Sequence, residues 1–148
     1  MRRIVSFLLC LAIVTAAGML IAEERKVVYP EKMSKADIGG EIFARPNMKK
    51  TNHDNGNTTL SVTTLKSSDK KFFTGMYKSG REREEYKEES YGVDEFMYFL
   101  EGSVTLTSAD GAVQVINAGE AVTISKEWMG TWESDGYTKI WVIYSNED

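Results

Sequence analysis

The stretch Gly92–Gly119 reads GVDEFMYFLEGSVTLTSADGAVQVINAG. Two of its runs, Glu95–Leu100 and Ser103–Thr107, are rich in aromatic and β-branched residues and are joined through a Glu-Gly pair. A third run, Val113–Ile116, follows an Ala-Asp-Gly turn. Short runs of strand-forming residues separated by Asp-Gly and Asn/Gly turns are typical of an antiparallel β-meander. This stretch therefore decides the fold class, and it predicts an all-β protein.

The same pattern continues on both sides of this stretch. Further strands are predicted at Leu60–Leu65, Lys71–Lys78, Ala121–Ile124, Trp128–Trp132 and Tyr137–Tyr144. The charged run Arg81–Glu89 is expected to form a solvated strand with cross-strand charge pairs. About eight short strands spaced by turns favour a β-sandwich or a β-barrel.

The residue order in Asp94–Gly102 is Asp-Glu-x-x-Tyr-x-Leu-Glu-Gly, and a strand, Asp-Gly and Ala-Gly-Glu follow it. This order resembles the cupin family, and in particular the branch that includes ureidoglycine aminohydrolase-like proteins and ethanolamine-utilisation cupins. The resemblance covers roughly Lys71–Tyr144, which is half of the chain. It implies a cupin jelly roll, a double-stranded β-helix barrel, in a single domain that follows a signal peptide.

The N-terminus has the composition of a secretory signal peptide. Arg2 and Arg3 supply positive charge, Ile4–Ala22 contains no charged residue, and Glu23 follows directly. Cleavage is expected after Ala22 or, as an alternative, at residues 16–18. An uncleaved anchor is the other alternative, because 19 uncharged, mostly apolar residues are just long enough to span a bilayer. We expect a secreted or periplasmic protein that has no membrane contact after cleavage.

The 148 residues suffice for one domain with a core of its own. Residues 1–22 are the predicted signal peptide, 23–57 a partly irregular extension, and 58–148 the barrel. Within the extension, Met33–Ile38 is spaced for one or two helical turns, with Ser34 as cap and a Gly-Gly pair as stop. The mature chain has 16 basic and 22 acidic residues, a net charge of −6, which argues against a nucleic-acid partner. It has no cysteine, because Cys10 lies in the signal peptide.

Metal-dependent cupins hold their ion with three histidines and a glutamate, and the resemblance places Glu95 at the glutamate position. The histidine positions fall on Glu88 and Ser90 or on Glu89 and Tyr91 in the first motif, and on Gly130 in the second. Imidazole is the neutral donor that suits transition metals, and carboxylates alone prefer hard ions. We therefore expect no metal site and no other cofactor.

Alternation along the strand at Asp94–Leu100 places Glu95, Met97 and Phe99 on one face and three apolar residues on the other. Since both faces are mostly apolar, neither should be left in water. One face is expected to line the barrel interior. The other needs a cover, either from a second subunit in a homodimer or from the N-terminal segment.

Carboxylates and rings are the groups that remain in the expected pocket. The predicted ligand-binding residues are Tyr77, Tyr86, Glu88, Glu95, Met97 and Trp132. Trp132 enters through the resemblance, because Gly130–Glu133 matches the Gly-Thr-Trp-Glu of related sequences. An aromatic wall beside a carboxylate suits a small amine or polyol. The purely structural alternative is that Glu95 accepts hydrogen bonds from a neighbouring loop while Trp132 fills the core.

Three functions are compatible with this pocket. The first is an exported domain that binds a small polar organic ligand in the barrel without the three-histidine metal centre. The second is a hydrolase or isomerase, metal-independent or with a weakly held carboxylate-bound ion. In that enzyme Glu95 would act as catalytic acid/base, because desolvation raises the pKa of a carboxyl group. The third is a structural or partner-binding barrel without a pocket.

Overall fold

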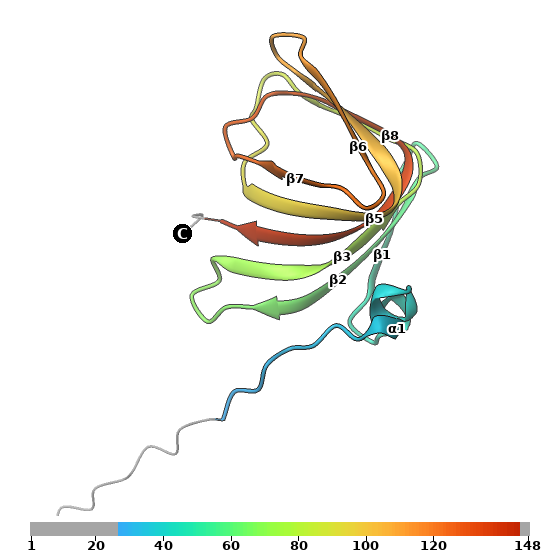
Figure 1. Cartoon of the computed structure of the whole chain (residues 1–148), viewed down its shortest axis with the longest axis vertical. Helices are drawn as coiled ribbons and strands as arrows, with labels where there is room; N and C mark the ends of the chain where they lie inside the picture. Colours follow the sequence, from blue (N-terminus) through green and yellow to red (C-terminus); the bar gives the residue numbers. More distant parts are fainter. Residues whose placement is uncertain (1–26, 146–148) are drawn as a thin grey trace, which may run out of the picture.

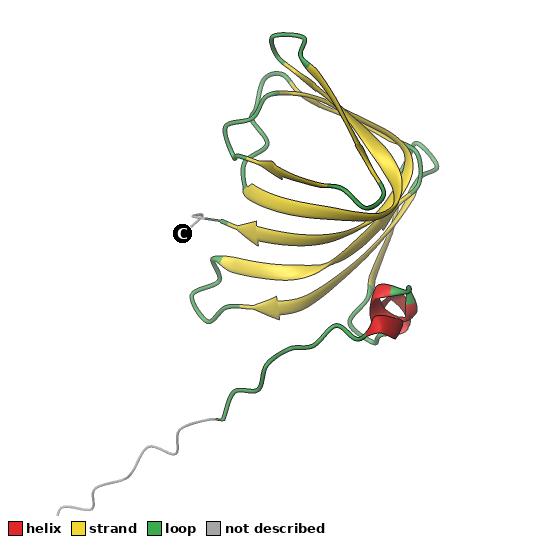
Figure 2. Cartoon of the chain, in the orientation of Figure 1, coloured by secondary structure: helices red, strands yellow, loops and turns green. Residues whose placement is uncertain are grey.

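Eight antiparallel strands form one strongly curved sheet in the computed structural model, which describes residues 27–145 (Figure 1). The predicted signal peptide at residues 1–22 lies outside the described residues. Within residues 27–145, no helix has the length and hydropathy that a membrane crossing requires. Strands dominate the fold, and the short helical segments lie together at one edge of the sheet (Figure 2). The all-β cupin jelly roll is confirmed.

The elements follow one another along the chain as α1 (Lys35–Ile38), the 3-10 turn η1 (Glu41–Ala44), β1 (Lys49–Asn52), β2 (Thr58–Lys66), β3 (Phe72–Ser79), β4 (Glu82–Tyr86), β5 (Asp94–Ser108), β6 (Val113–Asn117), β7 (Ala121–Ile124) and β8 (Gly130–Tyr144). Their spatial order is β1-β2-β3-β8-β5-β6, with β4 beside β8 and β7 beside β5. β5 and β8 are therefore the central strands: β5 pairs with β6, β7 and β8, and β8 pairs with β3, β4 and β5.

The predicted helical turn is confirmed as α1, and its start is fixed by a capping box. The Ser34 hydroxyl accepts from the Asp37 amide at 3.0 Å, and the Asp37 carboxylate accepts from the Ser34 amide at 2.8 Å. Two backbone donors that a helix start leaves unpaired are thereby satisfied. This turn positions η1 against the sheet.

Sharp bends in β5 and β8 close the sheet toward a barrel. Gly102 has φ +72° and Gly136 has φ +134°, and they occupy neighbouring cross-strand positions, with Gly102 opposite Tyr137 and Gly136 opposite Ser103. A Cβ on Gly102 would lie 1.9 Å from the Gly136 carbonyl oxygen. The Glu-Gly pair at 101–102 is therefore no turn between separate strands. It lies inside one long strand, directly after a bulge between Phe99 and Glu101, which corrects the expectation of two runs.

The curved sheet buries its inner face. The inner core consists of Met97, Phe99, Val104, Leu106, Ile116, Ile124, Trp132, Tyr137 and Trp141. The predicted alternation on β5 is confirmed, because Glu95, Met97 and Phe99 are buried inside. Phe96 and Tyr98, on the outer face, keep 43% and 38% of their surface exposed.

The N-terminal segment covers part of the outer face. Fully buried Ile42 of η1 packs with Val62 and Met76 of the sheet. Partly buried Met33, Phe43, Met48, Leu100 and Ile140 surround this contact. One of the two expected covers is thus present, but it extends over only one end of the face. Phe72, Phe96, Tyr98 and Tyr144 on that face stay exposed.

Candidate functional site

A cavity of about 460 Å³ lies on the inner face of the sheet. Its walls come from β2, β3, β4, β5 and β8 and from the loop before β5. The lining residues are Ser61, Thr63, Tyr77, Glu82, Glu84, Tyr86, Tyr91, Glu95, Trp132, Tyr137, Lys139, Trp141 and Ile143. A volume of this size falls within the range of small-molecule sites, and the lining combines rings with a few polar groups as such sites do.

Strand alternation explains why β4 and β8 contribute most of the lining. Glu82, Glu84 and Tyr86 are two residues apart on β4 and face the same side. On β8 the same rule groups Tyr137 with Lys139 and the two lining residues after it. Trp132 would face the opposite way from Tyr137 by simple alternation. The irregularity around Gly136 shifts the register, and it brings Trp132 to the cavity side.

A buried ion pair lies in the cavity wall. The Lys139 ammonium is 2.8 Å from Glu95 Oε1, and their side chains keep only 8% and 5% of their surface exposed. The Tyr91 hydroxyl donates to the other Glu95 oxygen. Lys139 Nζ also donates to Met97 Sδ at 2.9 Å. Glu95 is thus neutralised by one cation and oriented by one hydroxyl donor.

Three rings surround the same ammonium. Lys139 Nζ lies 5.0 Å from the centroid of Trp132, 5.7 Å from that of Tyr77 and 5.8 Å from that of Tyr137. Their π faces attract a cation, and the attraction grows where water is excluded. The Trp132 indole N–H is buried and has no hydrogen-bond partner within residues 27–145. The aromatic wall therefore stabilises the buried charge of Lys139.

The cavity lining carries more acid than base. Glu82 is held by two hydroxyl donors, Tyr137 at 2.6 Å and Ser79 at 2.5 Å. The Glu84 carboxylate forms no hydrogen bond or ion pair with any described residue. Glu82, Glu84 and Glu95 against Lys139 leave a formal charge of −2 on the lining. The cavity therefore attracts cations more strongly than anions.

The tyrosines of the site remain protonated at neutral pH. Burial, with the nearby charges of Glu84 and Glu82, raises the pKa of Tyr86 to about 12. Burial is also the main cause that raises the pKa of Tyr91 and Tyr137, and the adjacent Glu95 and Glu82 carboxylates add to it. A raised tyrosine pKa means a neutral hydroxyl below that pKa. These groups therefore serve as hydrogen-bond donors.

A family model, described as the EutQ-like cupin domain, matches residues 86–139. This part of the chain matches the EutQ-like cupin family. This stretch supplies much of the cavity, including Tyr86, Tyr91, Glu95, Trp132 and Lys139. A comparison with curated proteins finds no match.

Solved cupin structures share the fold of this domain. The EutQ protein of Clostridium difficile superposes with a TM-score of 0.53 at 15% identity, over 69% of this chain and 79% of that one. A DUF861-family protein from Pseudomonas syringae gives a TM-score of 0.57 at 16% identity, over 65% and 43%. A putative ethanolamine utilization protein Q from Salmonella typhimurium gives 0.51 at 12% identity, over 70% and 98%. At these identities the likeness shows the fold alone.

The cupin domain brings four of the six predicted ligand-binding residues together around the cavity: Tyr77, Tyr86, Glu95 and Trp132. Met97 is fully buried in the core behind the lining, where its sulfur accepts from Lys139. Glu88 does not reach the cavity. Strand β4 ends at Tyr86, so the chain leaves the sheet before Glu88, which is exposed in the bend that follows.

Sequence reasoning missed nine lining residues of the site, and the polar or ionisable ones with the largest side chains are Glu82, Glu84, Tyr91, Tyr137 and Lys139. A signal for Lys139 was present, because a lysine that alternates with aromatic residues in a strand shares their face. For Glu82 and Glu84, the charged run was interpreted as a solvated strand. The expected cross-strand charge pair is confirmed by Arg83 and Glu133. The alternate residues of the same strand, however, face the cavity.

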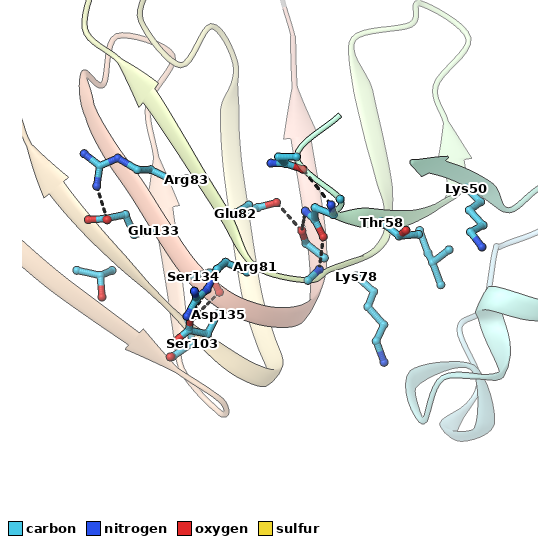
Figure 3. A pocket seen from close by; sticks show the side chains of 17 residues that line it. Lys50, Thr58, Lys78, Arg81, Glu82, Arg83, Ser103, Glu133, Ser134 and Asp135 are labelled. Atoms are coloured by element: carbon cyan, nitrogen blue, oxygen red, sulfur yellow. Dashed lines mark hydrogen bonds and ion pairs between the residues drawn. The ribbon is translucent and has the colours of Figure 1, made fainter. Parts of the chain in front are cut away.

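A second and larger groove, of about 1270 Å³, is lined by residues of β1, β2, β3, β4, β5 and β8 and of the loops between them (Figure 3). We call it the outer groove. Its charged residues mostly neutralise one another, because Arg83 pairs with Glu133 and Arg81 with Asp135. The side chains of both pairs are about half exposed or more, and exposed pairs of this kind contribute little energy. The groove has no aromatic residue in its lining. We therefore take the inner cavity as the candidate site of the cupin domain.

Proposed function

We propose that the cupin domain binds a small polar organic ligand in the inner cavity, and that this ligand is an amine. The observation that carries the proposal is the excess of carboxylates in an aromatic cavity. Glu84 has no partner of its own within residues 27–145, and it lies opposite Trp132 on the neighbouring strand. A carboxylate beside rings suits an organic cation through charge attraction and cation–π contact.

We further propose that binding needs no transition metal. Glu95, at the position that the family resemblance assigns to a metal-binding glutamate, already faces the Lys139 ammonium at 2.8 Å. A divalent cation at the same carboxylate would be repelled by that fixed positive charge. Glu95 accepts from an ammonium and a hydroxyl, and the next group, the Met97 thioether, accepts from the same ammonium, so these groups do not form the imidazole set that transition metals favour.

The two alternative functions differ in the support they receive. A barrel without a pocket is disfavoured by the cavity of about 460 Å³. A catalytic role for Glu95 has one favourable observation, the contact chain from Tyr91 through Glu95 to Lys139. Such a chain suits proton transfer. We place catalysis second because both carboxylate oxygens already have partners within the protein.

A thermal-shift screen of small amines, polyols and carboxylic acids tests the proposal. A ligand that binds only the native state at 100 times its Kd adds about 2.7 kcal/mol of stability, and the Tm should rise by several degrees. We expect amines to give the largest shifts. Glu84→Gln should weaken amine binding by about tenfold or more, the value of one charged contact. Glu85→Gln is the matched control, because Glu85 pairs with Arg83 and Lys87 away from the cavity.

Carboxylic acids as the best ligands, or equal effects of the two glutamine variants, would contradict the amine proposal. Glu95→Gln separates binding from catalysis. In a binder it should reduce affinity only in part, since a glutamine carbonyl can still accept from Lys139. In an enzyme that uses Glu95 as acid/base, turnover of the bound amine should collapse by at least about 10²-fold.

We also propose that the mature domain acts outside the cytoplasm and pairs with a second copy. The first part rests on the signal-like composition of residues 1–22. The second rests on the exposed outer face with Phe72, Phe96, Tyr98 and Tyr144, which the N-terminal segment leaves uncovered. Large exposed apolar patches commonly mark protein contacts.

A further inference from the structure

The Lys139 ammonium has hydrogen-bonding capacity that the protein does not use. An ammonium group carries three N–H donors. One donates to Glu95 Oε1 at 2.8 Å and a second to the sulfur of Met97 at 2.9 Å, and a thioether is a weak acceptor. No other oxygen or nitrogen within residues 27–145 accepts from the Lys139 ammonium. Only one strong acceptor therefore serves three donors.

Such a deficit is unusual for a buried charge. The Lys139 side chain is 8% exposed, so water supplies little compensation. Buried ionic groups are normally satisfied by well-placed acceptors, because an unmet donor costs free energy. The three rings at 5.0–5.8 Å attract the ammonium through their π faces, but they do not replace an oxygen acceptor for its N–H groups. Lys139 lines the cavity, where a ligand can supply that oxygen.

Trp132 lies next to both the Lys139 ammonium and Glu84, whose carboxylate has no partner within residues 27–145. The Lys139 ammonium lies 5.0 Å from the Trp132 ring, and Glu84 is the direct cross-strand neighbour of Trp132. The cavity therefore has a donor pole at Lys139 and an acidic pole at Glu84, and both adjoin one indole. A ligand lying along that indole would therefore face both groups.

We propose that the ligand is an amine that also carries a carbonyl oxygen, and that Lys139 Nζ binds this oxygen while Glu84 binds the ammonium. The inference rests on the proposed amine-binding function and adds the second recognition group. A carbonyl fits because it offers lone pairs and no donor to a group that itself only donates. A carboxylate fits less well, because it would add negative charge to a lining that already carries a formal −2.

Two probes of equal size test this recognition group. β-Alaninamide carries an amide carbonyl, and 3-methylbutylamine has the same number of heavy atoms and no oxygen. Titration calorimetry on the full protein gives the ratio of their dissociation constants. Removing Lys139 changes the charge felt by both ammonium groups equally, so the ratio isolates the contact to the carbonyl. A charge-assisted hydrogen bond should change the ratio by about tenfold or more.

The comparison uses Glu95→Gln against the double variant Glu95→Gln/Lys139→Met, so that no variant leaves a buried carboxylate without its cation. We expect the preference for β-alaninamide to fall by about tenfold in the double variant. Lys78→Met, on the outer face of β3, should leave the ratio unchanged. Amine binding with the same ratio in both Glu95→Gln proteins would overturn the inference and leave the proposed function standing. No binding of either amine to the wild-type protein would overturn both.

Discussion

Replacing Lys139 with methionine should lower the free energy of unfolding by about 3–5 kcal/mol. The substitution removes the cation that faces Glu95 at 2.8 Å and leaves a carboxylate that is 5% exposed. Only the Tyr91 hydroxyl would then compensate its charge. An uncompensated buried charge costs far more than the pair itself contributes. Urea unfolding followed by circular dichroism measures the loss directly.

Two further variants separate this effect from general damage. Glu95→Gln/Lys139→Met removes both charges and should recover most of the lost stability, because a neutral pair of similar volume is tolerated in a core. Lys78→Met changes a lysine whose side chain is 52% exposed, and it should cost less than about 0.5 kcal/mol. A loss below about 1 kcal/mol for Lys139→Met would mean that Glu95 is stabilised by other groups.

The second large effect is expected at the bend of β5. Gly102→Ala should destabilise the protein by about 3 kcal/mol or more, from backbone strain and steric overlap together. Gly102 has φ +72°, and an added Cβ would lie 1.9 Å from the Gly136 carbonyl oxygen. Because the contact is with backbone, no side-chain rotation can relieve it. The two central strands would have to separate where the sheet bends. Thermal unfolding of the variant measures the loss as a lowered Tm.

Gly111→Ala is the matched control for this variant. Gly111 also has a positive φ, +88°, but nothing lies within 4 Å of its added Cβ. Its cost should be the conformational strain alone, about 1–2 kcal/mol. Equal losses at the two glycines would show that the close approach at Gly136 does not limit the bend of the sheet.

Much of the fold follows from local sequence. The strand-forming runs, the turn at Asp110-Gly111 and the cap at Ser34 each depend on residues close together in the chain, and all three are found. The burial of Glu95 and Met97 follows from alternation in the same way. Such features are set by backbone preferences and the two-residue period of a strand.

The candidate site was predictable only in part, because long-range register decides which residues meet. The irregularity in β8 beside Gly136 reverses the facing of Trp132 relative to Tyr137, and simple alternation along the strand does not account for it. The end of β4 at Tyr86 removes Glu88 from the cavity, although the charged run continues beyond it. Lys139 meets Glu95 only because β8 pairs with β5, and the two residues are 44 positions apart in the chain.

A crystal structure of the protein with the amine that gives the largest thermal shift tests the central claim most directly. The account predicts the amine inside the cavity, with its nitrogen within hydrogen-bonding distance of Glu84 and its body against Trp132. An amine bound in the outer groove lined by Lys50 and Lys78 would contradict the account, as would an inner cavity filled by the protein's own side chains.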